Sequence, residues 1–503
     1  MPFDVVDQLN QANGVLYTYV LIGLLIGGGL YFTIRTRAVQ VRHFGTMIRY
    51  SLGSRRGAEG GISSFQAFAI GMATRIGIGN ITGVALALIL GGPGAIFWMW
   101  VVAAVGMATS FMEATLAQLF KEPAGDGTFR GGPAYYLTYG LRSRAWGVLF
   151  AVLLIFAMVV AMPMVQGNTI AIALQAGHGV EPMVTGIVLM VLTALVVFAG
   201  VRGVARAAEV MTPIMAIGYV LIAVFVIALN LGSVPGFLSD IVAGAFGLRE
   251  GLAGVAGGVM AAILNGAQRG LFTNEAGMGS APNIAASATP VPHHPATQGL
   301  VQSFGVFVDT LVVCTATALM ILLSGVLGLD NHAGAALTQQ AMAVHFGDWG
   351  MAFIAIVLFF FAGTSIFGNY AYAESATMFL GGGPRAILLL RLGGLAMVVW
   401  GCFANIGIVW ATADAAMGLM ALINLVAVVM LSKVSHVISV TTVSTNISKP
   451  CWPDPMTKSK LNDFQVSFLS HDLLSKRLSS MIKDYYPWYL KIESIVVLDD
   501  HVV

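Results

Sequence analysis

Apolar runs long enough to cross a lipid bilayer follow one another along the first 433 residues of this chain. A spanning helix needs about 20 mostly apolar residues, and eleven runs reach or approach that length. They cover residues 14–33, 62–90, 95–120, 145–175, 183–200, 209–231, 251–282, 299–327, 350–380, 386–403 and 406–433. Because a backbone in hydrocarbon must satisfy its hydrogen bonds internally, each run is expected to be helical. The sequence therefore predicts an all-α polytopic membrane protein with about 11 transmembrane helices.

The composition excludes several classes of protein. The chain is 57% hydrophobic and 10% charged, whereas a soluble protein carries about 25% charged residues. A formal net charge of +2 leaves no basic surface of the kind that binds nucleic acid. The three cysteines (Cys314, Cys402 and Cys451) are too scattered for a disulfide framework or a metal site. With no nucleophile–base arrangement and no phosphate-binding loop, we expect neither an enzyme nor an organic cofactor.

The basic residues predict how the helices are oriented. They gather in the loops after the first, third, fifth and ninth runs, as Arg35, Arg37, Arg42, Arg49, Arg55, Arg56, Lys121, Arg130, Arg142, Arg144, Arg202, Arg206, Arg385 and Arg391. The opposite loops hold a single basic residue, Arg249. Because basic loops stay in the cytoplasm, the N-terminus is expected outside and the C-terminus inside. The expected location is a bacterial-type cytoplasmic (inner) membrane.

Two of the runs are interrupted by residues that weaken a helix. The second contains Gly77-Ile78-Gly79-Asn80, and the seventh contains Phe-Thr-Asn-Glu-Ala-Gly-Met-Gly at residues 272–279. A broken backbone at membrane depth is tolerated only where protein or a water-filled cavity meets it. The two runs lie five helices apart and cross in opposite directions, as an inverted repeat of five plus five helices predicts.

This repeat divides the chain into five expected regions. Residues 1–34 form an extra, peripheral N-terminal helix, and residues 35–61 form a basic cytoplasmic loop. Residues 62–250 form the first five-helix repeat and residues 251–433 the second. The tail, residues 434–503, contains no glycine and no spanning run, so we assign it no role and expect poor order. A reading-frame shift or an unrelated extension explains it as well as a functional domain does.

Four motifs in order resemble the alanine or glycine:cation symporter family of the amino acid–polyamine–organocation superfamily. They are Gly-Ile-Gly-Asn-Ile at residues 77–81, Gly-Gly-Pro-Gly-Ala-Ile-Phe-Trp-Met-Trp at 91–100, Gly-Gly-Pro-Ala-Tyr-Tyr at 131–136 and Asn-Glu-Ala-Gly-Met-Gly-Ser-Ala-Pro at 274–282. The resemblance implies the leucine-transporter-type fold and sodium- or proton-coupled uptake of a small amino acid. Family members often carry Thr at Ile78 and Trp at Asn369, so both positions are expected near the substrate.

The expected substrate site combines the two breaks with two amides elsewhere. Half-helix ends present N–H groups to a carboxylate and carbonyls to an ammonium group or cation. The candidates are Gly77, Ile78, Gly79, Asn80, Gln166, Thr273, Asn274 and Asn369. The alternative reading is that the glycines allow close packing and that the amides form interhelical hydrogen bonds.

A Na⁺ site is expected at adjacent hydroxyls. The resemblance implies that Thr364 and Ser365 bind the ion together with carbonyls of the second run, and Thr74 and Asp309 are further candidates. The alternative is that these hydroxyls bond carbonyls of their own helix. Asp309 can also carry a proton, which keeps proton coupling open.

The remaining acids are interpreted mainly as structural. For Glu275, a functional role and a pairing with Arg75 or Arg269 are equally weighted. Glu113 falls toward the cytoplasmic end of the third run and is expected to form a structural pair.

The sequence therefore predicts a secondary active transporter that imports alanine, glycine or a similar small amino acid with Na⁺ by alternating access. Its expected partners are the amino acid, Na⁺ and membrane lipid, with no nucleic acid and no cofactor other than the coupling ion. An H⁺-coupled symporter, an ion or solute channel and a membrane-embedded enzyme or sensor remain as alternatives. The sequence gives no basis for choosing an oligomeric state.

Overall fold

The computed structural model describes residues 2–53, 61–124, 128–248, 255–291, 294–328 and 334–433. The predicted tail, residues 434–503, lies outside the described residues, as does the end of the predicted basic loop. Within them the chain is almost entirely helical. The fold class predicted from the apolar runs, an all-α polytopic protein, is therefore confirmed.

The first half of the chain contains most of the short elements. Its elements are α1 (Pro2–Leu16), η1 (Tyr17–Leu21), α2 (Ile22–Arg35), α3 (Val39–Arg42), α4 (Phe44–Gly53), α5 (Ser64–Arg75), η2 (Gly79–Gly83), α6 (Val84–Gly91), α7 (Gly94–Leu119), β1 (Glu122–Pro123), β2 (Phe129–Arg130), α8 (Pro133–Tyr135), η3 (Tyr136–Gly140), α9 (Arg144–Phe156), η4 (Ala157–Ala161), α10 (Met162–His178), α11 (Pro182–Val197), α12 (Gly200–Leu229) and α13 (Val234–Ala245). The η elements are π-helical turns that continue neighbouring α-helices.

The second half begins with the other interrupted run. Its elements are α14 (Val255–Asn274), α15 (Ala281–Ser287), α16 (Pro295–Val306), η5 (Phe307–Cys314), α17 (Thr315–Ser324), α18 (Ala335–Phe346), α19 (Asp348–Phe379), α20 (Pro384–Gly401) and α21 (Ile406–Met430). In the described ranges, each of the eleven apolar runs therefore coincides with one helix or with two or three successive helical elements.

Not every helix is long and apolar enough to cross a membrane. In the described part of the chain, eight helices are long and apolar enough to span, or nine if the bent pair α5 and α6 is one span. Helix α11 is shorter, and α14 begins at the edge of a described range. The chain is thus a multi-pass membrane protein, and the count of eleven stays a prediction.

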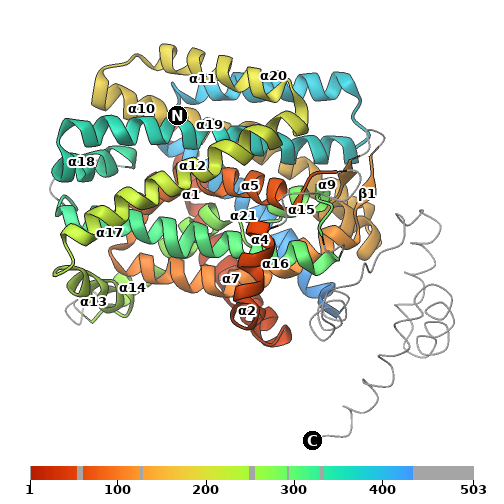
Figure 1. Cartoon of the computed structure of the whole chain (residues 1–503), viewed down its shortest axis with the longest axis horizontal. Coiled ribbons are helices and arrows are strands. Elements are labelled where there is room, and N and C mark those ends of the chain that lie inside the picture. The colour runs from red at the N-terminus through yellow and green to blue at the C-terminus, as the bar shows by residue number, and fades with distance from the viewer. Residues whose placement is uncertain are drawn as a thin grey trace, which may run out of the picture.

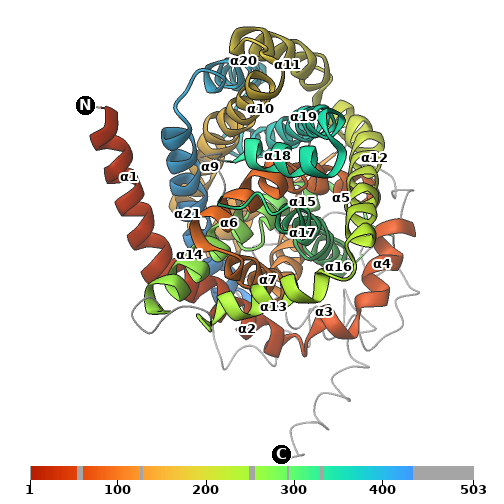
Figure 2. The same cartoon turned by 90° about the vertical axis from the view of Figure 1, so that its left-hand side faces the viewer.

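The long helices lie side by side, with the broken ones inside. They run roughly across the page in Figure 1 and are seen end-on in Figure 2. Helices α5, α6 and α15 lie in the interior of the bundle, whereas α11 and α20 lie at one edge. The second half of α14 is also buried. Helix α1 packs on α21 and α2 packs on α7, both at the periphery of the bundle.

Close approach of backbones holds the bundle together in lipid, where hydrophobic burial gives no drive between helices. A methyl group at Gly167 of α10 would overlap the carbonyl oxygen of Val398 in α20. A methyl group at Gly94 would likewise overlap the backbone of Gly244 in α13. Glycine is required at both positions because the neighbouring backbone occupies the space of a side chain.

Several short helices were not expected. The segment interpreted as a basic loop contains α3 and α4, and α4 packs against α16. Helices α13 and α18 lie in stretches read as loops, and they pack on α7 and α19. Their apolar segments are too short to span a bilayer, so a search for runs of spanning length does not find them.

Candidate functional site

The first break lies between α5 and η2. Helix α5 ends at Arg75, η2 begins at Gly79, and the two halves are bent by 46°. In a continuous helix Gly77 N–H would donate to the Ala73 carbonyl. Here Gly77 N–H donates to Asn80 Oδ1 at 3.0 Å, so the break is capped by its own asparagine. The Ala73 carbonyl is thereby freed for another partner.

The second break lies between α14 and α15. Helix α14 ends at Asn274, and the chain then passes through Glu275 (φ +56°), Gly277 (φ +89°) and Gly279 (φ +84°) before α15 begins at Ala281. A left-handed conformation at a residue other than glycine costs roughly 1–2 kcal/mol. The strained backbone at Glu275 is therefore maintained by the contacts around it.

Two side chains replace the helical hydrogen bonds lost at this second break. Gly277 N–H donates to Glu113 Oε1 of α7 at 3.3 Å, and Asn424 Nδ2 of α21 donates to the Gly277 carbonyl at 2.9 Å. Asn424 also donates to Glu113 Oε2 at 2.8 Å, and Tyr136 donates to Asn424 Oδ1. Glu113 is structural, as expected, but its partners are the unwound backbone and an amide rather than a cationic side chain.

The two breaks meet inside the bundle. A methyl group at Gly79 would lie 2.8 Å from Phe272 Cδ1 and 3.0 Å from Thr273 Cγ2. The side chain of Ile78, between α5 and η2, is completely buried. The structure therefore brings Gly79 and Thr273 together, as the inverted repeat predicts.

A buried carboxylate joins the breaks to η5. Asn80 Nδ2 donates to Asp309 Oδ1 at 2.6 Å, and Thr310 Oγ1 donates to Asp309 Oδ2 at 2.8 Å. Thr273 Oγ1 lies 3.4 Å from Thr310 Oγ1. Within the described ranges, no Lys or Arg lies within salt-bridge distance of Asp309. The cluster gathers carboxylate and hydroxyl oxygens, the ligands that hard cations prefer.

The adjacent hydroxyls of α19 have different partners. Ser365 Oγ lies 3.0 Å from the freed carbonyl of Ala73 and 2.9 Å from the carbonyl of Phe361 in its own helix. Thr364 Oγ1 donates only to carbonyls of its own helix, at 3.0 and 3.1 Å, as the alternative reading proposed. Thr74 Oγ1 bonds the Gly71 carbonyl and the Tyr372 hydroxyl. Ser365 is thus the hydroxyl that faces the first break.

Several buried amides have unused hydrogen-bonding atoms. In the described structure, Gln166 Oε1, Asn274 Nδ2 and both amide atoms of Asn369 are buried without a partner. Leaving such an atom unpaired costs about 1–3 kcal/mol, so each is a candidate contact for a polar ligand. Asn369 lies one helical turn after Ser365. Gln166 lies on α10, which packs on α19 and α21, and no hydrogen bond in the described ranges joins it to either break.

An ion pair and two aromatic rings cover the site beside α14. Arg269 Nη2 lies 2.5 Å from Asp414 Oδ2 of α21, and its guanidinium lies 4.8 Å from the Trp410 ring centroid. The rings of Phe272 and Trp410 are 4.9 Å apart. Arg269 therefore pairs with Asp414 and not with Glu275, whose Oε2 accepts from Ser280 at 2.5 Å. Sequence reasoning had left the partner of Arg269 open.

Main-chain bonds join the residue before α5 to the residues after α15. Ile62, which precedes α5, forms a parallel bridge to Ala288, which follows α15. Ile62 N–H donates to the Ser287 carbonyl at 3.3 Å, and Thr289 N–H donates to the Ile62 carbonyl at 2.9 Å. Lys121 Nζ donates to the Ala288 carbonyl at 2.8 Å. Burial lowers the pKa of Lys121 to about 7. We call Ile62, Ser287, Ala288 and Thr289 the backbone clasp.

Known membrane transporters resemble this chain over most of its length. Residues 4–443 match the model of the sodium:alanine symporter family. The chain is 45% identical to the probable sodium/glutamine symporter GlnT of Bacillus subtilis, over 84% of this chain and 87% of that protein. It is 46% identical to the amino-acid carrier protein AlsT of the same organism, over 85% and 90% of the two chains. It is 37% identical to the sodium/alanine symporter AgcS of Methanococcus maripaludis, over 86% and 96%.

Solved structures include a similar fold. The crystal structure of MhsT in complex with L-phenylalanine superposes with a TM-score of 0.54 at 14% identity, covering 78% of this chain and 94% of that one. At this identity the likeness concerns the fold alone. The leucine-transporter-type fold expected from the four motifs is therefore confirmed.

Proposed function

The chain belongs to the sodium:alanine symporter family, and on this premise we propose that it imports alanine, glycine or a similar small amino acid together with Na⁺. It is a membrane transporter and not an enzyme. The proposed mechanism is alternating access. The bundle of α5–α7 and α14–α17 moves against the remaining helices and exposes the breaks first to one side and then to the other.

The observation that carries this proposal is the packing of the two breaks against each other at buried, unpaired polar atoms. A zwitterion needs acceptors for its ammonium group and donors for its carboxylate. The freed carbonyls at the end of α5 supply acceptors, and the free Nδ2 atoms of Asn274 and Asn369 supply donors. The tight contact of Gly79 with Thr273 leaves little space, which favours a small side chain on the substrate.

The proposed coupling-ion site lies between the end of α5 and Ser365. The carboxyl end of a half-helix carries partial negative charge from its unpaired carbonyls, and Ser365 already bonds one of them, that of Ala73. Thr364 would join this site only after its hydroxyl leaves its own helix. Thr74 lies on the same turn of α5 and supports the same location.

The carboxyl group of Asp309 can bind a second cation or carry a proton. Its carboxylate is fully buried and accepts hydrogen bonds from Asn80 and Thr310. Proton coupling therefore remains the alternative that a specific observation favours. No contact among the described residues specifically favours a channel.

Uptake into proteoliposomes tests these proposals together. We expect accumulation of labelled alanine when only a Na⁺ gradient is imposed. Accumulation driven by a pH gradient alone would assign the coupling to H⁺. We also expect saturable counterflow of labelled alanine, which a continuously open channel does not produce. Absence of counterflow would refute the carrier.

Side-chain tests locate the substrate. Asn274→Ala and Asn369→Ala, which remove the two proposed donors, are expected to abolish alanine uptake in protein that still folds. The matched control is Asn230→Ala, because Asn230 Nδ2 bonds only the Val226 carbonyl of its own helix. Wild-type uptake by both site variants would refute the substrate assignment.

The proposed orientation places the clasp and the basic loops in the cytoplasm and the Arg269–Asp414 pair outside. It rests on the clustering of Lys and Arg in the loops on one side. Single cysteines introduced at exposed loop positions on the two sides, labelled in intact cells with a membrane-impermeant thiol reagent, test it. Labelling at the Arg-rich side would reverse the orientation.

A further inference from the structure

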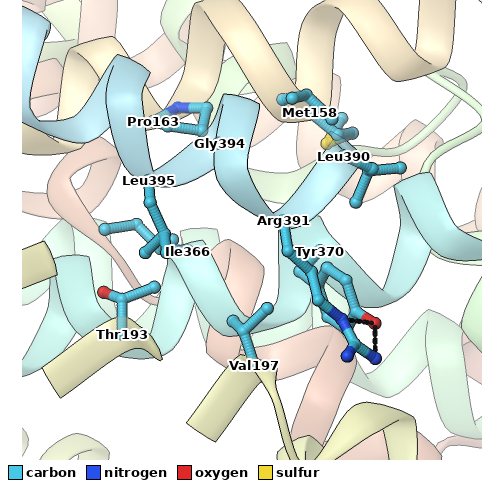
Figure 3. A pocket seen from close by; sticks show the side chains of 11 residues that line it. Met158, Pro163, Thr193, Val197, Ile366, Tyr370, Leu390, Arg391, Gly394 and Leu395 are labelled. Atoms are coloured by element: carbon cyan, nitrogen blue, oxygen red, sulfur yellow. Dashed lines mark hydrogen bonds between the residues drawn. The ribbon is translucent and has the colours of Figure 1, made fainter. Parts of the chain in front are cut away.

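A shallow pocket lies at the edge of the bundle, away from the two breaks. It lies between α9–η4–α10, α11, α19 and α20, and Figure 3 shows its lining side chains. Helices α11 and α20 lie at the outer edge of the bundle in Figure 2, so the pocket faces lipid. Most of its lining is apolar and includes Val159, Pro163, Val197, Ile366, Leu390 and Gly394.

One charged side chain, Arg391, enters this apolar pocket. Arg391 is the eighth residue of α20, which places it about 10 Å along the helix from its first residue, Pro384. Its Nε and Nη2 atoms donate to the Tyr370 hydroxyl at 2.9 and 2.7 Å, as the dashed lines in Figure 3 mark. Its guanidinium lies 5.3 Å from the ring centroids of both Phe198 and Tyr370.

The guanidinium lacks a negative partner. In the described part of the chain, no Asp or Glu lies within salt-bridge distance of Arg391. A guanidinium has five N–H donors, and the Tyr370 hydroxyl takes only two of them. Charged groups at membrane depth are normally paired. Glu374 lies close to the same Tyr370 hydroxyl but beyond salt-bridge distance of Arg391, so the guanidinium keeps free donors and has no direct acidic partner among the described residues.

The position of Arg391 also indicates which leaflet is involved. A methyl group at Gly200, where α12 begins, would lie 3.9 Å from Arg391 Nη2. The guanidinium therefore lies beside the turn between α11 and α12, on the side of the membrane that carries the other basic loops. From this end of its helix, a long Arg side chain can reach the lipid headgroups.

We propose that this pocket binds an anionic phospholipid of the leaflet on the basic side. The lipid phosphate accepts hydrogen bonds from Arg391, in the paired geometry that a guanidinium offers to phosphate. One acyl chain lies along the apolar lining beyond it, over Val159 and Gly394. A zwitterionic lipid fits less well because its own ammonium group brings a second positive charge beside the guanidinium.

The size of the pocket supports a lipid chain over a second amino-acid site. Its accessible volume is about 20 Å³, close to that of one water-sized sphere. A hollow of this size does not enclose an amino acid, whereas part of an acyl chain lying in the bilayer fits along it.

The lipid site and the cation site share helix α19. Ile366 and Tyr370, which line the pocket, each follow a site residue of α19, namely Ser365 and Asn369. Lipid binding therefore packs a second face of α19, about 100° around the helix from the face that carries the coupling-ion hydroxyl. This inference does not depend on the transported substrate, and lipid binding is measured without transport.

Native mass spectrometry of the purified full chain tests the proposal, with phosphatidylglycerol or phosphatidylcholine added at equal concentration. We expect wild-type protein to retain phosphatidylglycerol roughly tenfold more than phosphatidylcholine, a ratio typical of one good charged contact. Arg391→Gln should reduce phosphatidylglycerol retention to the phosphatidylcholine level. The matched control is Arg385→Gln, because Arg385 is exposed at the start of the same helix and does not line the pocket.

A second variant tests the acyl-chain contact and leaves the charge in place. A methyl group at Gly394 would lie 3.9 Å from Val159 Cγ1, which is ordinary contact, so Gly394→Val should fold and fill the pocket. It is expected to lower phosphatidylglycerol retention severalfold. Equal retention of the two lipids by wild-type protein, or wild-type retention by both Arg391→Gln and Gly394→Val, would overturn the proposal. If glycerol phosphate displaces bound phosphatidylglycerol as well as the whole lipid does, the proposed contact with the acyl chain would be refuted.

Discussion

The contact between Gly77 and Ser365 gives a quantitative test of the proposed ion site. A methyl group at Gly77 would overlap Ser365 Oγ, whereas its next neighbours would be the Thr74 carbonyl oxygen at 3.5 Å and Ser365 Cβ at 3.6 Å. Only the hydroxyl therefore requires glycine at this position. Gly77→Ala should lower the free energy of unfolding by about 1–3 kcal/mol, the usual cost of overpacking.

Ser365→Ala removes a different interaction. It leaves the Ala73 carbonyl without the hydroxyl 3.0 Å away, which costs about 1–3 kcal/mol for a buried acceptor. In the double variant the methyl group at Gly77 no longer meets a hydroxyl. The double variant should therefore be about as stable as Ser365→Ala alone, with a coupling of at least ~1 kcal/mol between the two sites.

Thermal unfolding of purified protein in detergent, with and without Na⁺, measures both effects. Na⁺ should raise the melting temperature of the wild type and of Gly27→Ala, a control whose added methyl group meets nothing within 4 Å. Ser365→Ala and the double variant should lose this Na⁺ effect. Strict additivity of the two substitutions would refute the steric argument, and retention of the Na⁺ effect by Ser365→Ala would move the ion elsewhere.

Three further predictions follow from contacts around the site. Burial lowers the pKa of Lys121 to about 7, below its unfolded value of about 10.4. Between these two pH values the unfolded chain binds more protons than the folded chain. The free energy of unfolding should therefore rise with pH across that window. Lys121→Met should flatten the dependence of melting temperature on pH between about pH 7 and 10, and an unchanged slope would contradict the assignment. Asp414→Asn leaves Arg269 buried and unpaired and should lower the free energy of unfolding by about 3–5 kcal/mol. Adding Arg269→Gln should recover part of that stability in the same unfolding assay. No recovery would count against the ion pair. Glu113→Ala should cost about 1–3 kcal/mol for each stranded donor, whereas Glu113→Gln, which keeps one acceptor for Gly277, should cost less, a difference that denaturant titration resolves.

The two breaks could be predicted from sequence because their cause is local. Gly77-Ile78-Gly79-Asn80 and residues 272–279 place poor helix formers inside spans that otherwise favour a helix. The contact between the breaks, seen at Gly79 and Thr273, also followed from the order and direction of the spans. These features need no knowledge of side-chain geometry.

The partners of individual side chains could not be predicted in the same way. Thr364 and Ser365 are adjacent, so they point about 100° apart around α19. Which of them meets α5 depends on how the two helices are rotated. Asn80 was expected at the substrate, and its amide in fact bonds Gly77 and Asp309.

Some long-range partners left almost no trace in the sequence. Asn424 lies in an apolar helix and was not singled out, yet it holds both Gly277 and Glu113. A polar side chain within an apolar span was the available signal, because burying an unpaired amide is costly. The roles of Gln166 and Asn369 as substrate ligands stay predictions.

The backbone clasp has a consequence for how such a protein can diverge. Its bonds join main-chain atoms of Ile62, Ser287 and Thr289, so any residue that keeps an extended backbone there preserves them. Two backbone bonds contribute only about 1–3 kcal/mol in total, an amount that thermal motion overcomes within a transport cycle. Relatives can therefore exchange the side chains of Ile62 and Ser287 while the two main-chain bonds of the backbone clasp persist.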